Sequence, residues 1–284
     1  MVLLNSPKVI NELLGMDLNF KNPQIMGVLN VTPDSFSDGG RFSRIGNAVD
    51  QALLMIKSGA SIIDVGGEST RPGSIKVSLE DELERVIPVI KAIRLNSDVV
   101  ISVDTSKPKV MREAVEAGAN LINDVYALRE PGALEMAASL DVAVCLMHMQ
   151  ENPKTMQNQP EYTEVIEDVG AFFCERLKAC QQAGIKESNI ILDPGFGFGK
   201  TLDHNLSLLA HLDKFKQYGR PLLVGLSRKS MWGELLGKKV DERVSASVIS
   251  ALLAIINGAA IVRVHDVAEM AEALTIYKAL QLAN

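Results

Sequence analysis

The sequence is short of cysteine, of aromatic residues and of long apolar runs, and each shortage excludes a class of protein. Its three cysteines, Cys145, Cys174 and Cys180, are odd in number and have no Cys-x-x-Cys spacing, which argues against a disulfide framework and a structural zinc site. We interpret them as buried thiols. The first 15 residues lack the apolar core of a secretory signal, and the most apolar run, Ala251–Val262, is interrupted by an Asn-Gly pair. We therefore expect a cytoplasmic protein without a membrane anchor.

Basic residues are also fewer than acidic ones, 29 against 35. The net charge at pH 7 is −6 and only 5% of the residues are aromatic, so a broad basic and aromatic surface for nucleic acid is not expected. With 47% hydrophobic residues, the chain of 284 residues can bury a large core. Its length suits either two domains or one closed α/β barrel, which typically takes about 250 residues. Any anionic ligand must be held by a local cluster of cations.

Eight short runs rich in Val, Ile and Leu recur along the chain and are typical of parallel strands that are covered on both faces. Each interval between them leaves room for a helix and a crossover. No Pro/Ser-rich linker divides the series, so we predict a single-domain (β/α)8 TIM barrel over residues 1–284, with a core over about 23–281. A doubly wound open sheet is the alternative. The predicted strands are Ile25–Val31, Ser61–Val65, Val99–Val103, Asn120–Asp124, Val142–Met147, Asn189–Leu192, Pro221–Leu226 and Ala259–Val264.

The intervals between the strands carry helix signals. A capping box of Ser and Asp predicts a helix over 78–95, and a Ser-x-Pro start predicts another over 106–118. A longer amphipathic pattern covers 163–183. Acidic residues crowd positions 80–84 at the start of the first helix, and we interpret them as a solvated face that suits the helix dipole.

Polar side chains follow the predicted strands, and the carboxyl ends of barrel strands meet on the rim where barrel enzymes keep their active sites. Each one alone has a structural explanation: Asp64, for example, can pair with a neighbouring arginine. Their joint placement on one rim predicts a ligand site. These strand-end groups are Asn30, Asp64, Asp104, Asn123, Asp124, His148, Asp193, Ser227–Ser230, Arg263, His265 and Asp266.

The rim groups fall into two sets with opposite chemistry. His265 lies two residues from Arg263, so both side chains point to the same side of the strand, whereas His204 and His211 lie on a predicted helix. Groups suited to phosphate or pyrophosphate are Asn30, Lys229, Arg263 and His265. A deeper set of acceptors with one amide is Asp104, Asn123 and Asp193. A small donor-rich heterocycle that carries a pyrophosphate fits both sets.

Two segments resemble well-known binding motifs, but each lacks a feature that its motif requires. The segment 193–201 (DPGFGFGKT) suggests a phosphate-binding P-loop, but three residues rather than four separate Gly195 from Gly199. We expect its glycines to let the backbone pass close to a flat ligand. The segment 34–39 resembles a calcium loop, but Phe36 occupies the third position, where a carboxylate is needed. We interpret it as a rim loop that closes over a substrate.

Six ordered signatures at successive strand ends resemble the dihydropteroate synthase family. The resemblance spans nearly the whole chain. It is carried by 25–40 (IMGVLNVTPDSFSDGG), 63–73 (IDVGGESTRPG), 102–108 (SVDTSKP), 192–200 (LDPGFGFGK), 225–230 (GLSRKS) and 263–266 (RVHD).

This resemblance implies a transferase of folate biosynthesis and a sulfonamide target. It would join 6-hydroxymethyl-7,8-dihydropterin diphosphate to 4-aminobenzoate, giving 7,8-dihydropteroate and pyrophosphate. The resemblance also implies a TIM barrel, Mg²⁺ as cofactor, a homodimer, and small-molecule substrates rather than nucleic acid or membrane as partners.

The resemblance further implies a role for each matching residue. The pterin ring would be held by Asp104, Asn123, Asp193 and Lys229. The pyrophosphate would be bound by Asn30, Arg263 and His265, with Asn30 also on the metal. The 4-aminobenzoate site would comprise Phe36, Thr70, Arg71, Pro72 and Ser230. The catalytic groups would be Asp38, Asp104, Lys229 and Arg263.

The implied mechanism is an SN1-like displacement in which pyrophosphate leaves before the amine adds, so no covalent enzyme nucleophile is required. Two other functions remain open. A methyltetrahydrofolate-binding methyltransferase barrel would share the pterin contacts but has no need for Arg263 and His265. A non-catalytic pterin-binding protein would keep the pocket without turnover.

Overall fold

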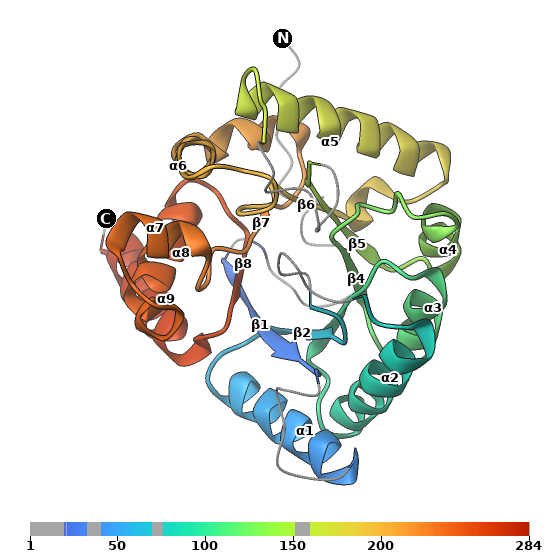
Figure 1. The fold of residues 1–284 in the computed structure, drawn as a ribbon. Helices are drawn as coiled ribbons and strands as arrows, with labels where there is room; N and C mark the ends of the chain where they lie inside the picture. Colours follow the sequence, from blue (N-terminus) through green and yellow to red (C-terminus); the bar gives the residue numbers. More distant parts are fainter. Residues whose placement is uncertain (1–19, 21, 33–40, 70–75, 151–159, 284) are drawn as a thin grey trace.

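The computed structural model describes residues 20, 22–32, 41–69, 76–150 and 160–283, and within them parallel strands alternate with helices (Figure 1). The strands are β1 (Gln24–Asn30), β2 (Ile62–Gly66), β3 (Val100–Asp104), β4 (Leu121–Asp124), β5 (Ala143–Met147), β6 (Ile190–Asp193), β7 (Leu223–Val224) and β8 (Ile261–Val264). The helices are α1 (Arg41–Lys57), α2 (Leu79–Asn96), α3 (Pro108–Glu116), α4 (Ala133–Leu140), α5 (Val165–Gln182), α6 (Leu202–Ala210), α7 (Ser230–Leu236), α8 (Val244–Ile256) and α9 (Val267–Leu282).

The strands close on themselves into a barrel, and the helices form a ring around it (Figure 1). The strand order is β6-β5-β4-β3-β2-β1-β8-β7 with every pairing parallel. Between the two remaining edges, the Leu192 N–H donates to the Pro221 carbonyl over 3.0 Å, and Leu192 forms a parallel bridge with Leu222. The predicted (β/α)8 barrel is confirmed, and the doubly wound open sheet is wrong. The assignment of all of residues 1–284 to one domain stays a prediction.

The observed strands begin and end within one or two residues of the predicted ones, and β7 is shortened at both ends. We expected a strand over Pro221–Leu226, but only Leu223–Val224 pair in the sheet. The chain leaves the sheet after these residues because the Leu226 carbonyl accepts the Trp232 indole N–H over 2.9 Å, and Arg228 then adopts a left-handed conformation with φ 58°. The loop that carries Lys229 therefore starts earlier than its apolar pattern suggests.

The helix starts agree with their capping signals in one case and differ in another. Ser78 caps α2 as predicted, with its hydroxyl accepting the Asp81 N–H over 3.1 Å. Helix α3 begins at Pro108, so Lys107 rather than Ser106 is its N-cap. The predicted long helix is α5, which begins at Val165 and ends at Gln182.

The barrel interior is apolar at the bottom and polar above. Side chains alternate between the two faces of a strand, so residues two positions apart share the interior. A single buried cluster takes at least one residue from each strand and forms the floor: Met26, Ile62, Val100, Leu121, Ala143, Cys145, Ile191, Leu223 and Ile261. The inward positions beyond this floor, nearer the strand carboxyl ends, include Asp64, Ser102, Asp104, Asn123, Asp193 and Arg263.

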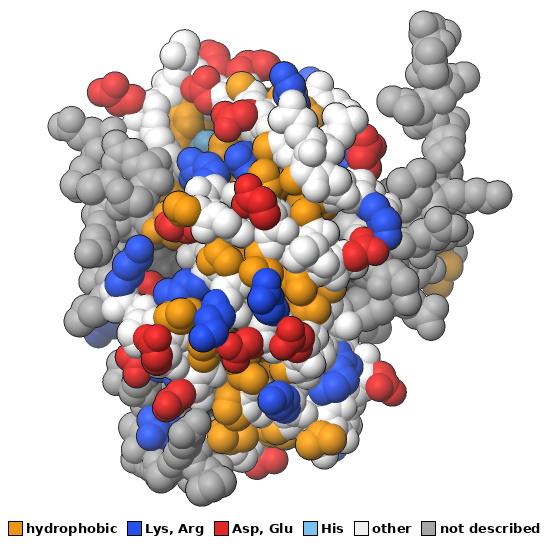
Figure 2. Space-filling view, turned by 90° about the vertical axis from the view of Figure 1, so that its right-hand side faces the viewer, with side chains coloured by type: hydrophobic (Ala, Val, Ile, Leu, Met, Phe, Trp, Pro, Cys, Tyr) orange, Lys and Arg blue, Asp and Glu red, His pale blue; other side chains and the backbone are white. Residues whose placement is uncertain are grey.

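The outer surface is mixed in charge on the side that α2, α3 and α4 form. Figure 2 shows Lys and Arg side chains interspersed with Asp and Glu there, with apolar side chains between them. Among the described residues, no helix combines the length and apolar character that a membrane crossing needs.

Candidate active site

An ion pair between distant strands organises the polar half of the barrel interior. The Arg263 Nε on β8 donates to Oδ2 of Asp64 on β2 over 2.7 Å, and an Nη2 proton goes to Oδ2 of Asp104 on β3 over 2.9 Å. The Asn123 side-chain amide on β4 donates to the same Asp64 oxygen over 3.1 Å. The strand-pair register brings Asp104 opposite Asn123. Four of the predicted rim groups therefore form one connected network.

One buried oxygen of this network, Oδ1 of Asp64, lacks a hydrogen-bond partner within the part of the chain that the structure describes. Burial raises the pKa of Asp104 to about 7, although the Arg263 charge acts in the opposite direction and Asp64 adds to the rise. The two carboxylates in turn raise the pKa of Arg263 against the effect of its burial. Arg263 therefore stays a cation, and the Asp104 carboxyl can accept or release a proton near pH 7.

Asp193 lies at the end of β6 on the opposite side of the interior. Its side chain is buried, and its Oδ1 accepts the Gly195 N–H over 2.7 Å. Burial raises the pKa of Asp193 to about 6, while the Gly195 N–H and the charges of Lys229, Lys200 and Arg263 lower it. A carboxylate fixed in this way can accept hydrogen bonds from a ligand with its second oxygen.

Lys229 extends over the same side of the site from the loop after β7. Its Nζ lies 4.2 Å from the centre of the Phe198 ring, a cation–π contact. Gly197 approaches the Lys229 side chain closely, because a Cβ at that position would lie 3.2 Å from Lys229 Cδ. The predicted pair of Asp193 and Lys229 is thus brought together by the loop after β6.

Two further predicted anion-binding residues lie at the rim. The His265 backbone N–H donates to the Ser227 hydroxyl over 3.2 Å, and the ring Nδ1 lies 3.0 Å from the same oxygen. Asn30 is the last residue of β1 and is half-buried. A Cβ placed on Gly66 would have both Asn30 Oδ1 and Asp104 Oδ2 within 4 Å. Asn30 therefore points toward the same mouth as the Asp104 carboxylate.

The predicted 4-aminobenzoate residues are only partly described. Ser230 is exposed at the start of α7. The other members of this set, and the catalytic candidate on the first rim loop, lie outside the described residues: Phe36, Asp38, Thr70, Arg71 and Pro72.

One sequence interpretation is wrong for the acidic run at the start of α2. Glu82 is not solvated but 1% exposed. Its Oε1 accepts the Thr105 hydroxyl over 2.5 Å, and its other oxygen pairs with Lys107, which also pairs with Glu68. A buried carboxylate is costly without a partner of opposite charge, and Lys107 in the loop after β3 is that partner for Glu82.

The cysteines and histidines also differ in part from expectation. Cys145 and Cys180 are buried as predicted, but Cys174 is exposed on α5. His204 lies on α6, on the helix predicted for it, and takes part in the capping of that helix. His148 is buried, and together with Lys200 it forms a contact that no sequence motif indicated.

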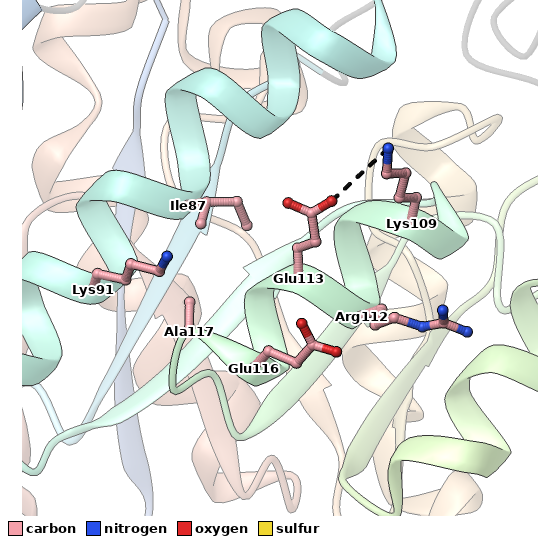
Figure 3. Close-up of a pocket in the computed structure, with 7 residues that line it drawn as sticks. All are labelled: Ile87, Lys91, Lys109, Arg112, Glu113, Glu116 and Ala117. Carbon is pink, nitrogen blue, oxygen red and sulfur yellow. Dashed lines mark ion pairs between the residues drawn. The ribbon is translucent and has the colours of Figure 1, made fainter.

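A separate hollow of about 530 Å³ lies between α2 and α3 in the outer ring (Figure 3). It is lined by charged side chains of both signs, and Lys109 pairs there with Glu113 at 4.0 Å. This hollow is on the helical wall, whereas the connected network of buried polar groups is at the strand ends. The strand-end network is the candidate active site.

Comparison with known proteins shows to which family the chain belongs. The pterin binding enzyme family matches residues 26–265. The dihydropteroate synthase of Escherichia coli strain K12 is 56% identical over 265 residues, which cover 93% of this chain and 94% of that protein. The Yersinia pestis dihydropteroate synthase, solved with a sulfonamide drug complex, shares 51% identity and a TM-score of 0.90 over 94% of this chain and 97% of that one.

A third protein has been solved with a product. The Xanthomonas albilineans dihydropteroate synthase in complex with 7,8-dihydropteroate shares 47% identity and a TM-score of 0.84, over 92% of this chain and 95% of that one. Likeness at this level of identity, over nearly the full length of both chains, goes beyond a shared fold. The chain belongs to the pterin-binding enzymes and, within them, to the dihydropteroate synthase family.

Proposed function

We propose that the strand-end network is where this transferase condenses 6-hydroxymethyl-7,8-dihydropterin diphosphate with 4-aminobenzoate to give 7,8-dihydropteroate and pyrophosphate. The observation that carries the proposal is the set of buried acceptors around one cation: Asp64, Asp104, Asn123 and Arg263 in one network, with Asp193 across the barrel. A planar, donor-rich heterocycle with an anionic substituent satisfies these groups.

The pterin ring is assigned to Asp104, Asn123, Asp193 and Lys229. Carboxylates accept from the amino and ring N–H groups of a pterin, and the Lys229 ammonium donates to its ring acceptors. Because Asp104, Asn123 and Asp193 are buried, a ligand that leaves one of them unpaired loses about 1–3 kcal/mol of binding free energy. Recognition by shape and hydrogen bonding therefore excludes heterocycles with a different donor pattern.

The diphosphate is assigned to Asn30, Arg263 and His265. Arg263 uses Nε and Nη2 on the two carboxylates, and its Nη1 has no hydrogen-bond partner among the described residues. That remaining donor is available to an anion at the mouth. His265 is oriented by its two contacts with Ser227.

Magnesium fits this arrangement as an ion that the substrate brings with it. The described residues contain no cluster of three or more His, Cys, Asp or Glu side chains that could hold a metal, so Asn30 would offer one oxygen while phosphate oxygens and water complete the shell. Mg²⁺ commonly binds in this way, through few protein ligands and substrate phosphates. When bound, it would neutralise charge on the leaving pyrophosphate.

Catalysis then consists mainly of stabilising charge as it separates. Arg263 lies where negative charge grows on the departing pyrophosphate, while the Asp104 and Asp193 carboxylates face the ring where positive charge grows. The amine of 4-aminobenzoate adds to the exocyclic carbon after the C–O bond has broken. Its site is assigned to Ser230, Phe36, Thr70, Arg71 and Pro72, and a catalytic role is assigned to Asp38. All of these except Ser230 lie outside the described residues.

The test is incubation of the purified protein with both substrates and Mg²⁺, without any corrinoid protein, followed by chromatography of the pterin products. We expect 7,8-dihydropteroate in amounts equal to the 4-aminobenzoate consumed. Binding of the pterin diphosphate without product would favour the non-catalytic protein. Methyl transfer from a methylated folate, with no condensation, would favour the methyltransferase.

We also propose a homodimer that forms through α8 and α9, which pack side by side (Figure 1). Ile249, Leu253 and Ile256 on α8 are 60%, 47% and 54% exposed, and Ile276 and Leu280 on α9 are 65% and 60% exposed. An apolar stripe of this kind on neighbouring helices suits a twofold contact. A double substitution of Ile249 and Ile276 by Glu should give a monomer by light scattering. Leu95→Glu on α2 is the control, and an unchanged dimer in the double variant would contradict the assignment.

A cytoplasmic location is part of the same proposal. It is supported by three cysteines that are all free thiols, Cys145, Cys174 and Cys180, since free thiols persist in reducing compartments. Localisation of the tagged protein by cell fractionation tests it.

A further inference from the structure

The glycine-rich loop after β6 folds around its own lysine. Lys200 is 4% exposed. Its Nζ donates to the carbonyls of Gly195 and Phe198 over 2.9 and 3.0 Å, and lies 2.9 Å from Nδ1 of His148. The Nζ also lies 3.4 Å from the His148 carbonyl oxygen. An ammonium has three protons, so these four acceptors use all of them. Lys200 therefore cannot act on a phosphate as the lysine of a P-loop does.

His148 acts here as a neutral acceptor. Burial and the nearby Lys200 charge lower the pKa of His148 to about 2. With Nδ1 accepting from Lys200, the ring proton sits on Nε2. The lysine thus ties the loop after β6 to the residue that follows β5.

The loop held by Lys200 carries two groups of the pterin site. Gly195 supplies the N–H that binds the Asp193 carboxylate, and Phe198 packs under Lys229. Gly195 has φ 69°, and a Cβ there would lie 1.8 Å from the His148 carbonyl oxygen, so only glycine allows this close approach. The neighbouring backbone alone therefore requires glycine at this position, and the expectation that the loop's glycines admit a flat ligand stays a prediction.

We propose that Lys200 is a positioning residue for pterin recognition. By binding a carbonyl near each end of the loop, it fixes the Gly195 N–H that orients Asp193 and holds Phe198 beneath Lys229. The inference rests on the proposed function, because it requires Asp193 and Lys229 to contact the pterin.

The charge of Lys200 also acts on the pKa of Asp193, which a lysine with a purely structural role would not be expected to affect. The charged and titratable groups that face Asp193 are Lys200 on its own loop, Lys229 after β7, Arg263 on β8 and the Cys145 thiol on β5. The three cations lower the pKa of the Asp193 carboxyl. Burial lowers the pKa of Lys200 itself to about 7, so Lys200 is a cation at the pH values near 6 where Asp193 titrates. Removal of that charge should therefore raise the pKa of Asp193 further.

The experiment measures the affinity for 6-hydroxymethyl-7,8-dihydropterin, which carries no phosphate, between pH 5 and pH 8. Lys200→Met is compared with the wild type, with Lys200→Arg, and with Lys178→Met, an exposed lysine on α5. We expect Lys200→Met to weaken binding about tenfold at pH 8 and to move the loss of affinity at low pH upward by about half a pH unit or more. Lys200→Arg should restore the pH position with intermediate affinity, and Lys178→Met should match the wild type.

Wild-type affinity and an unmoved pH dependence in folded Lys200→Met would overturn the proposal. If that variant does not fold, the affinity of Tyr162→Phe is measured instead. The Tyr162 hydroxyl donates to the Gly199 carbonyl over 2.8 Å and so supports the same loop. We expect Tyr162→Phe to weaken pterin binding about threefold, and unchanged affinity would overturn the proposal. A wild-type protein that binds no pterin would instead contradict the proposed function, so the two failures are distinguishable.

Discussion

Arg263 and Asp64 lie 199 positions apart in the chain, yet Arg263 Nε reaches Asp64 Oδ2 over 2.7 Å inside the barrel. The Asp64 side chain is fully buried. A buried ion pair is costly to break, because the partner that remains is left as an uncompensated charge. The residue that faces the leaving group in our account therefore also holds β8 to β2 and β3.

Arg263→Ala should remove most activity and lower the free energy of unfolding by about 3–5 kcal/mol, because Asp64 and Asp104 lose their common cation. Arg263→Lys should recover part of the stability but little of the turnover, since an ammonium cannot form the same fork of hydrogen bonds. Urea unfolding and product formation measure the two effects. Arg112→Ala on α3 is the exposed control, and a fully active Arg263→Ala would refute the assignment.

Pterin binding should weaken as the pH falls through about 7 to 6. The reason is that the pKa of Asp104 is raised to about 7 and that of Asp193 to about 6, chiefly by burial, and a protonated carboxyl accepts fewer hydrogen bonds. Titration of 6-hydroxymethyl-7,8-dihydropterin keeps phosphate ionisation out of the measurement. Asp193→Asn should bind weakly at every pH, and a flat affinity profile for the wild type would count against both residues.

The raised pKa values of Asp104 and Asp193 also make the stability of the protein depend on pH, but stability falls as the pH rises, whereas pterin binding strengthens. The ordinary pKa of an Asp side chain is about 3.9, so between about pH 4 and pH 7 the folded protein holds protons that the unfolded chain releases. The contribution of these two carboxyls to the free energy of unfolding therefore falls as the pH rises through that window. Asp193→Asn should show a shallower fall than the wild type in urea unfolding from pH 4 to pH 7. An equal slope would show that Asp193 titrates normally in the folded protein.

Glu82→Gln should destabilise the protein by about 1–2 kcal/mol, because the buried ion pair with Lys107 is lost while Lys107, which is partly exposed, keeps Glu68 as a partner. The matched control is Glu80→Gln, an exposed acid on the same helix turn, which should change stability by less than about 0.5 kcal/mol. Chemical denaturation of both variants provides the comparison. Similar stabilities would restore the interpretation of this acidic run as a solvated face.

Alkylation of the native protein should modify Cys174 alone and leave turnover nearly intact. Cys174 is exposed on α5, whereas Cys145 and Cys180 are buried, and burial raises the pKa of the Cys180 thiol to about 11. Mass spectrometry after brief treatment with iodoacetamide locates the label, and Cys174→Ala is the control. Loss of activity on labelling that Cys174→Ala prevents would place this thiol near the chemistry.

The sequence predicted the barrel and the convergence of Asp104, Asn123, Asp193 and Arg263, because apolar runs mark the strands and each polar group follows one of them. It also allowed the pairing of Asp64 with an arginine without saying which one. Local patterns could not choose among arginines, because the pair joins strands at opposite ends of the chain.

Other contacts could not be predicted from local patterns in the sequence. Glu82 resembles its acidic neighbours on α2, and only the position of the loop after β3 places Lys107 against it. Lys200 was visible only as the end of an incomplete P-loop, while its partner His148 lies 52 positions earlier. The short β7 likewise depends on a tertiary contact, the bond from the Trp232 indole N–H to Leu226.

Condensation at the strand-end network is tested by following pyrophosphate release from 6-hydroxymethyl-7,8-dihydropterin diphosphate with Mg²⁺, with and without 4-aminobenzoate, while 7,8-dihydropteroate is measured in the same samples. We expect product to appear in step with pyrophosphate when 4-aminobenzoate is present, and Arg263→Ala to remove most of both. No release in either condition, from a protein that nonetheless binds the pterin, would contradict condensation at this network.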